Sequence, residues 1–267
     1  MPDPMPSLDL LRCFWQKAGP VILDGIYPRV CRHCDKLLPS DRPRTGIQAW
    51  LCKACETELT EIAPPYCRVC GEPYDGAMTG AFRCWNCEGR RIAFDFAVSA
   101  FKAEGPLREM IHAFKYNRDL SLRAALVDLL RPALLDPRLA SEDLTQWLMV
   151  PVPLHPLRQM WRGFNQSWEL CTLLSQQTGI PTAQILRRRT RTRAQARLSQ
   201  KARQANLRGA FALRPAFPWQ RGTRLKGRRI LLVDDVLTTG ATAHECAKIL
   251  KRHAGVEKVV VITAARG

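Results

Sequence analysis

The chain has 267 residues, and its 46% hydrophobic content is typical of a globular protein. It contains no run of about 18 apolar residues, which argues against a membrane-spanning helix. The formal charge is +17, and residues 187–229 hold 15 of the 41 basic side chains and no acid. Such a one-sided segment favours an anionic partner, either a pyrophosphate group or a nucleic-acid backbone, over a merely solvated basic loop.

The first 30 residues predict a short lead-in helix. Leu8, Leu11, Phe14 and Trp15 recur at helical spacing, and Pro20 ends the pattern. We expect this helix to pack on a neighbouring domain, although a helix lying on a membrane surface is an alternative. The same segment lacks the basic stretch and apolar run of a signal peptide, so we expect a cytoplasmic protein.

Residues 31–90 contain four CxxC pairs. The eight cysteines are Cys31, Cys34, Cys52, Cys55, Cys67, Cys70, Cys84 and Cys87. Four thiolates around one ion suit tetrahedral zinc, and in a cytoplasmic chain such pairs indicate metal rather than disulfides. Pairing in chain order predicts a double zinc ribbon, and a crossed pairing of the first pair with the third is the alternative. Because every coordination position would be filled, both zinc ions would be structural.

Residues 91–267 alternate between strand and helix patterns, which predicts an open parallel α/β sheet. The predicted strands are residues 93–101, 147–152, 229–233 and 258–263, and the predicted helices are residues 107–116, 120–130, 164–177 and 241–253. The sequence thus predicts a lead-in helix over residues 1–30, a double zinc ribbon over residues 31–90 and an α/β domain over residues 91–267.

The stretch ILLVDDVLTTGATA, residues 230–243, predicts an anion site between a strand and a helix. Asp234 and Asp235 follow the apolar strand, at the edge where α/β sheets bind ligands. Backbone N–H groups at a helix N-terminus attract phosphate, and Gly240 allows close backbone approach. The two carboxylates can accept hydrogen bonds from a ribose 2′,3′-diol. The alternative is an ordinary strand–helix turn with an Asp N-cap; no Walker A pattern occurs in the chain.

The pattern D-D-x-x-T-T-G-x-T resembles that of type I phosphoribosyltransferases. The resemblance implies the type I phosphoribosyltransferase fold, with an open parallel sheet, and binding of phosphoribosyl pyrophosphate (PRPP) together with Mg²⁺. It also implies that Asp234 and Asp235 hold the ribose hydroxyls. The 5′-phosphate would be cradled by Thr238, Thr239, Gly240, Ala241 and Thr242.

Further stretches are similar to the ComF competence family. They are the cysteine pairs within residues 31–87, GPLR at residues 105–108 with Ile111-His112, VPVPLHPLRQMWRGFNQ at residues 150–166, and residues 195–211. The resemblance implies a role in DNA uptake during natural transformation. Single-stranded DNA and DNA-uptake proteins would then be partners.

Four basic residues are candidates for binding pyrophosphate. Arg158 and Arg162 lie in a Pro/Gly-rich segment that we expect to be a loop, and their guanidinium forks fit phosphate oxygens. A solvated loop is the alternative. Residues 195–206 resemble the mobile lid of related enzymes, so Lys201 and Arg203 are expected to close over the pyrophosphate.

Three functions fit these observations. The first is a ComF-like protein that binds PRPP and acts on DNA; the second is an active phosphoribosyltransferase, with Asp234, Asp235, Arg158 and Arg162 as its catalytic residues; the third is a PRPP-sensing regulator. No motif in the sequence identifies the acceptor substrate that such a transferase would use. Four tryptophans can stack on bases, although aromatic residues are more often core: Trp50, Trp85, Trp161 and Trp219.

Overall fold

The computed structural model describes residues 28–74, 76, 82–190, 207–215 and 225–267. The chain divides into two compact units, Met1–Glu58 (unit 1) and Leu59–Gly267 (unit 2). Several predicted features lie outside the described residues: the N-terminal helix, the lid cations Lys201 and Arg203, and Trp219.

Unit 1 contains two short helices, η1 (Ile47–Ala49) and α2 (Lys53–Thr57). The strands of unit 2 are β1 (Phe96–Lys102), β2 (Leu148–Pro151), β3 (Leu186–Arg188), β4 (Phe211–Leu213), β5 (Arg229–Leu237) and β6 (Lys258–Arg266). Its α-helices are α3 (Gly105–His112), α4 (Arg123–Leu130), α5 (Pro156–Arg162), α6 (Gln166–Thr178) and α8 (Ala241–Ala254). Its short helical turns are η2 (Ala113–Asn117), η3 (Leu120–Leu122), η4 (Arg131–Leu135) and η5 (Leu144–Gln146). None of the helices in the described ranges is both long and apolar enough to cross a membrane.

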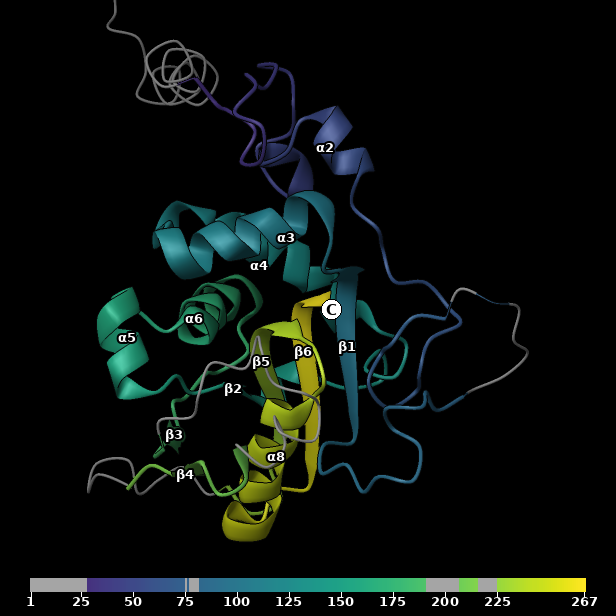
Figure 1. Ribbon diagram of the computed structural model, residues 1–267, viewed down its shortest axis with the longest axis vertical. Helices are drawn as coiled ribbons and strands as arrows, with labels where there is room; N and C mark the ends of the chain where they lie inside the picture. Colours follow the sequence, from purple (N-terminus) through teal and green to yellow (C-terminus); the bar gives the residue numbers. More distant parts are fainter. Residues whose placement is uncertain (1–27, 75, 77–81, 191–206, 216–224) are drawn as a thin grey trace, which may run out of the picture. The chain divides into compact units, whose positions relative to one another are not determined.

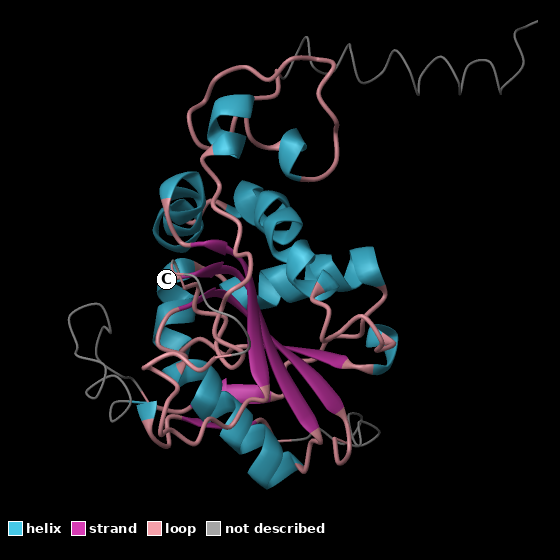
Figure 2. Cartoon of the chain, turned by 90° about the vertical axis from the view of Figure 1, so that its right-hand side faces the viewer, coloured by secondary structure: helices cyan, strands magenta, loops and turns pink. Residues whose placement is uncertain are grey.

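The main sheet of unit 2 has four strands in the order β1-β6-β5-β2, and every neighbouring pair is parallel. This confirms the predicted open parallel sheet. Helices α4 and α6 cover one face, and α8 covers the other (Figure 2). The two-stranded antiparallel sheet of β3 and β4 packs beside α8 (Figure 1).

The second set of cysteines is part of the hydrophobic core of unit 2. Cys67, Cys70, Cys84 and Cys87 are buried in one cluster with apolar side chains of β2, β5, β6 and α8. The backbone joins the two regions as well, because the N–H of Ala97 in β1 donates to the carbonyl of Val69 at 2.8 Å. This group of cysteines and the sheet therefore share one core.

Strands β3 and β4 were not predicted from the sequence, and two predicted segments that carry site residues differ from the prediction. Arg158 and Arg162 lie on helix α5 and not in a loop, because His155 caps its N-terminus and Pro156 occupies its first turn. Strand β5 continues past Val233 to Leu237, so Asp234 and Asp235 lie within the strand. It continues because β6 extends in register to Arg266 and supplies backbone partners along the whole length.

Candidate functional site

The eight cysteines form two separate four-thiol groups, paired in chain order. Within each group the sulfur atoms all lie within 4.8 Å of one another. A tetrahedral ion about 2.3 Å from each sulfur places the sulfurs about 3.8 Å apart. The observed Sγ–Sγ distances of 3.7 Å for Cys34–Cys52 and 3.5 Å for Cys70–Cys84 match that spacing. Both groups therefore fit a structural zinc ion, and the crossed pairing is not formed.

The second four-thiol group is held by donors to its sulfur atoms. The backbone N–H of Cys84 donates to Cys67 Sγ at 3.3 Å. The guanidinium of Arg266 lies 3.8 Å from Cys70 Sγ. Such donors orient thiolate ligands and offset the negative charge that four thiolates leave on a zinc site.

A cavity of about 440 Å³ lies beside the last residues of β5 and the first turn of α8. Its walls come from η2, the segment from β2 through α5 to α6, β3, β5 and α8. The polar and aromatic residues that line it are Lys115, Tyr116, Arg158, Trp161, Arg162, Asn165, Gln166, Ser167, Arg188, Asp234, Asp235, Thr238, Thr239 and Thr242. Its size and its convergent polar groups are those of a small-molecule site.

The adjacent carboxylates of β5 have different partners. The Nζ of Lys115 lies 2.9 Å from Asp235 Oδ1, and this carboxylate is almost fully buried. Asp234 Oδ1 accepts hydrogen bonds from the hydroxyl of Ser167 at 2.9 Å and from the backbone N–H of Asp235 at 3.0 Å. Burial and the neighbouring Asp235 raise the pKa of Asp234 to about 7, although Lys115 and Ser167 act in the opposite direction.

The loop after β5 is shaped for an anion. Gly240 caps α8 with φ of 69°, a left-handed conformation that glycine adopts without strain. Thr239 Oγ1 lies 3.4 Å from the N–H of Ala241 and orders the start of the helix. The N-terminus of this 14-residue helix thus opens onto the cavity, where its dipole and free N–H groups attract negative charge.

Three arginines line the same cavity as this loop. Arg158 and Arg162 come from α5, and Arg188 comes from β3. Arg188 is only 7% exposed, and burial lowers its pKa to about 10. Burial also lowers the pKa of Arg162, while nearby Tyr116 and Asp235 raise it. Burying several cations together is costly, so the arrangement favours an anionic ligand that compensates them.

Two buried donors at the cavity support the same conclusion. Within the described part of the chain, Arg162 Nε and Gln166 Nε2 have no hydrogen-bond partner. Leaving a buried donor unsatisfied costs about 1–3 kcal/mol. Both residues line the cavity, so a bound molecule with acceptor oxygens would satisfy them.

Aromatic side chains form the rim of the cavity. Trp161 is 54% exposed and Tyr116 is 47% exposed, and their ring centroids are 6.5 Å apart. The guanidinium of Arg118 lies over Trp161 at 5.6 Å, and that of Arg162 lies over Tyr116 at 5.1 Å. Trp85 is also exposed, at 78%, so the expectation that these tryptophans are core is wrong for Trp85 and Trp161.

The structure brings together most of the residues that the sequence singled out. Asp234, Asp235, Arg158, Arg162 and the loop of residues 238–242 all line one cavity. Sequence reasoning missed Lys115, Ser167 and Gln166 as site residues, and it treated Arg188 only as one charge of the basic segment. Gln166 and Ser167 were the easiest of these to find from the sequence, since Gln166 ends the stretch of residues 150–166 that already stood out and Ser167 follows it.

The fold and site define a class: an open parallel-sheet α/β protein with an anion loop at a helix N-terminus and two four-thiol groups of the zinc type. A family profile described as a double zinc ribbon domain matches residues 22–88. Competence protein F of Haemophilus influenzae is 34% identical over 220 residues, which cover 81% of this chain and 90% of that protein. DNA utilization protein YhgH of Escherichia coli K12 is 32% identical over 204 residues, which cover 76% of this chain and 85% of that protein.

The chain therefore belongs to the ComF competence family, as its sequence motifs predicted. Competence protein ComFC of Bacillus subtilis is a more distant relative, 22% identical over 85% of this chain and 90% of that protein. Among solved structures, an orotate phosphoribosyltransferase from Aeropyrum pernix matches 63% of this chain and 80% of its own, with 17% identity and a TM-score of 0.28.

Proposed function

We propose that the cavity at the end of β5 binds PRPP with Mg²⁺, and that the protein uses this site in the handling of DNA. The observation that carries the proposal is one cavity that combines two adjacent carboxylates, a helix N-terminus and the unsatisfied donors of Arg162 and Gln166. PRPP offers matching groups, namely a diol, a 5′-phosphate and a pyrophosphate. The names of the relatives, competence protein F and DNA utilization protein YhgH, support the connection to DNA.

Each part of PRPP has a partner in this arrangement. Residues 238–242 and the N-terminus of α8 receive the 5′-phosphate. Asp234 and Asp235 accept hydrogen bonds from the ribose hydroxyls. In the unliganded protein these carboxylates are bound by Ser167 and Lys115, and the diol replaces those contacts. Arg158, Arg162 and Arg188 neutralise the pyrophosphate. Mg²⁺, when bound, supplies additional positive charge to the pyrophosphate oxygens.

Two alternatives use the same site in other ways. In a phosphoribosyltransferase the arginines would stabilise the departing pyrophosphate while an acceptor attacks C1, and Lys201 and Arg203 would close over the leaving group. In a PRPP-sensing regulator the site would bind PRPP without turnover. Release of pyrophosphate on mixing with PRPP and candidate acceptors distinguishes the transferase from the other two.

The PRPP site is tested by removing both carboxylates. Asp234→Ala/Asp235→Ala should weaken PRPP binding at least tenfold, or about 1.4 kcal/mol, because hydrogen bonds to charged groups are worth about 1.5–3 kcal/mol each. Calorimetric titration in the presence of Mg²⁺ gives the two dissociation constants. Asp143→Ala serves as the control, since this aspartate only caps the short helix η5. Equal affinity of wild type and the double variant would refute the assignment.

A second function, binding of single-stranded DNA, is favoured by the surface around the cavity. The first three arginines of the basic segment, at the end of β3, alternate in direction. Arg188 is buried and lines the cavity, while Arg187 and Arg189 are exposed. The exposed rings of Trp161 and Tyr116 add stacking surfaces of the kind that bind bases without sequence preference. A surface that binds single-stranded nucleic acid typically combines cations that contact the phosphate backbone with aromatic rings on which any base can stack.

The DNA-binding surface predicts a specific dependence on salt. Arg187→Gln/Arg189→Gln should flatten the plot of log affinity against log salt by about 1.4, because each lost phosphate contact on a single strand removes about 0.7. Filter binding with an oligonucleotide of mixed sequence measures the slope. Arg108→Gln/Arg131→Gln removes two exposed cations elsewhere in unit 2 and should leave the slope unchanged. No retention of DNA by the wild type at low salt would exclude this function.

A further inference from the structure

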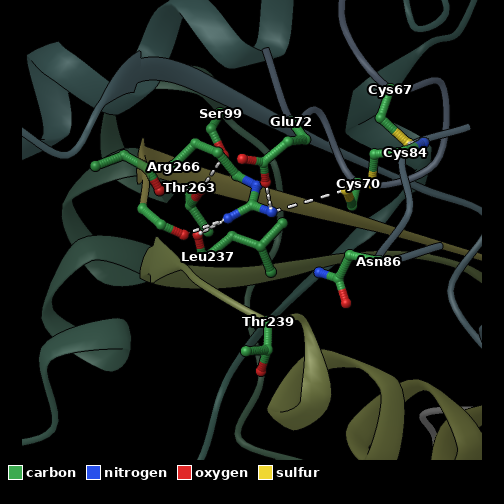
Figure 3. A network of polar contacts seen from close by, with 12 residues as sticks. Cys67, Cys70, Glu72, Cys84, Asn86, Ser99, Leu237, Thr239, Thr263 and Arg266 are labelled. Atoms are coloured by element: carbon green, nitrogen blue, oxygen red, sulfur yellow. Dashed lines mark hydrogen bonds and ion pairs between the residues drawn. The ribbon is translucent and has the colours of Figure 1, made fainter. Parts of the chain in front are cut away.

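Arg266 joins the second four-thiol group to the end of strand β5. It is the last residue of β6, its side chain is 3% exposed, and it lies in register with Leu237, the last residue of β5. Figure 3 shows its guanidinium between Glu72 and Cys70 on one side and Leu237 on the other. A buried guanidinium with partners on two elements holds those elements at a fixed separation.

The contacts of Arg266 divide between its two terminal nitrogens. Nη2 donates to the carboxylate of Glu72 and lies 3.8 Å from Cys70 Sγ. Nη1 donates to the carbonyl of Leu237 at 2.9 Å. The backbone N–H of Gly267 donates to the same carbonyl, also at 2.9 Å. The carbonyl of Leu237 is therefore fixed by two donors just before the loop that begins at Thr238.

Zinc in the second four-thiol group fixes the position of Cys70 Sγ, because a tetrahedral ion holds its four sulfurs about 3.8 Å apart. Nη2 of Arg266 lies 3.8 Å from that sulfur, so a bound ion also defines where the guanidinium lies. Without the ion, nothing holds the four cysteine side chains together, and Glu72 is left as the other partner of Nη2. Zinc loading thus favours the position of Arg266 in which Nη1 reaches the carbonyl of Leu237.

We propose that Arg266 is a positioning residue that couples zinc in the second four-thiol group to the shape of the anion loop, so that loading this zinc strengthens PRPP binding. This inference rests on the proposed PRPP site. Coupling between two ligands is reciprocal, so PRPP must also strengthen zinc binding by the same factor. Typical coupling between sites is about 5- to 150-fold, and we expect at least fivefold here.

The first test compares Arg266 variants that keep both zinc ions. Arg266→Met removes the donors, and Arg266→Lys keeps the charge but cannot reach both sides with one ammonium group. Zinc content is measured by elemental analysis and PRPP affinity by calorimetry with Mg²⁺. Both variants should hold two zinc ions and bind PRPP at least fivefold more weakly than wild type. If Arg266→Met does not fold, Arg266→Lys alone decides the outcome.

The second test measures the coupling from the zinc side. Cys55→Ser leaves the second zinc site as the only complete one, and Cys87→Ser leaves only the first. In a competition titration with a colorimetric chelator, PRPP with Mg²⁺ should tighten the binding of zinc to Cys55→Ser at least fivefold. It should have no effect in Cys87→Ser or in Cys55→Ser/Arg266→Lys.

The outcomes separate the two proposals. If wild type binds PRPP, and the Arg266 variants bind it equally tightly with no protection of zinc by PRPP, the coupling through Arg266 is wrong while the PRPP site stands. If wild type binds no PRPP, the proposed function fails first and the coupling fails with it.

Discussion

The two neighbouring carboxylates of β5 have different partners. Asp235 is paired with Lys115 at 2.9 Å. Asp234 is enclosed beside Asp235 and accepts from Ser167, and burial together with that neighbouring charge raises its pKa to about 7. Near neutral pH the carboxyl group of Asp234 is therefore partly protonated. A cation or a diol that binds to this carboxylate favours the loss of that proton.

This raised pKa predicts how stability changes with pH. The folded state binds a proton on Asp234 more tightly than the unfolded chain, where the pKa of this side chain is near 3.8. The contribution of Asp234 to stability is therefore fully present below pH 3.8 and is lost as pH rises to about 7. Asp234→Asn mimics the protonated form. It should be more stable than wild type at pH 8, by at most about 4 kcal/mol at 1.36 kcal/mol per pKa unit. The difference should vanish near pH 4.

Thermal unfolding of both proteins across this pH range measures the effect. Ser167→Ala is an informative companion, because it removes a hydrogen bond that favours the charged form of Asp234. It should extend the pH-dependent loss of stability to higher pH and so increase the total loss. A stability difference between Asp234→Asn and wild type that is the same at pH 4 and pH 8 would contradict the environment described for Asp234.

The sequence revealed those site residues that are contiguous. Asp234, Asp235 and residues 238–242 form one stretch, so their shared geometry follows from one strand, one turn and one helix. Lys115 and Arg188 come from η2 and β3, which are remote in sequence and meet β5 only through tertiary packing. No local pattern encodes such a meeting, which is why a charge run predicted basic character in residues 187–229 but not the inward turn of one arginine.

At the scale of elements, the anion loop depends on the left-handed conformation of Gly240. Gly240→Ala should cost about 1–2 kcal/mol from backbone strain, and the melting temperature should fall by about 2–4 °C per kcal/mol. The added Cβ would meet the ring of Phe94 at 3.5 Å and Leu237 at 4.0 Å, in ordinary contact, so the cost lies in the backbone conformation. A change of that conformation would move the N–H groups that receive the phosphate, so PRPP affinity should fall several-fold.

Gly179→Ala is a matched control for the loop. Gly179 caps α6 with φ of 73°, and a Cβ there would meet open space. It should lose a similar amount of stability and keep full affinity for PRPP. Equal affinity of Gly240→Ala and wild type would show that the loop does not contact the ligand.

The elements themselves were predicted well where the apolar pattern is long. The strands over residues 147–152 and 258–263 and the helix over residues 241–253 lie within about three residues of β2, β6 and α8. Helix α5 was missed because its seven residues carry no buried side chain and follow a proline-rich stretch, so neither periodicity nor composition marks it. The end of β5 was missed because two aspartates interrupt its apolar run, and pairing with β6 overrides that composition.

At the scale of the molecule, the two four-thiol groups belong to different compact units. The first lies in Met1–Glu58, and the second shares its core with the sheet of Leu59–Gly267. Loss of the second zinc should therefore destabilise the α/β unit, while loss of the first should not.

Matched serine variants measure this difference. Cys55→Ser and Cys87→Ser each remove the last ligand of one group, and each should reduce bound zinc from two ions to one. Calorimetric scans should show the main transition unchanged in Cys55→Ser and several degrees lower in Cys87→Ser. Equal shifts in the two variants would mean that the second group stabilises the sheet no more than the first. Wild-type protein without zinc, prepared in the absence of chelator, would refute both metal sites.

The most direct measurement of the central claim is a crystal structure of the zinc-loaded protein soaked with PRPP and Mg²⁺. The account predicts density in the cavity beside β5, with the ribose hydroxyls on Asp234 and Asp235 and the 5′-phosphate on residues 238–242 at the N-terminus of α8. The pyrophosphate should lie toward Arg158, Arg162 and Arg188. Density for PRPP at another place on the protein, or a cavity that stays empty at millimolar PRPP, would contradict it.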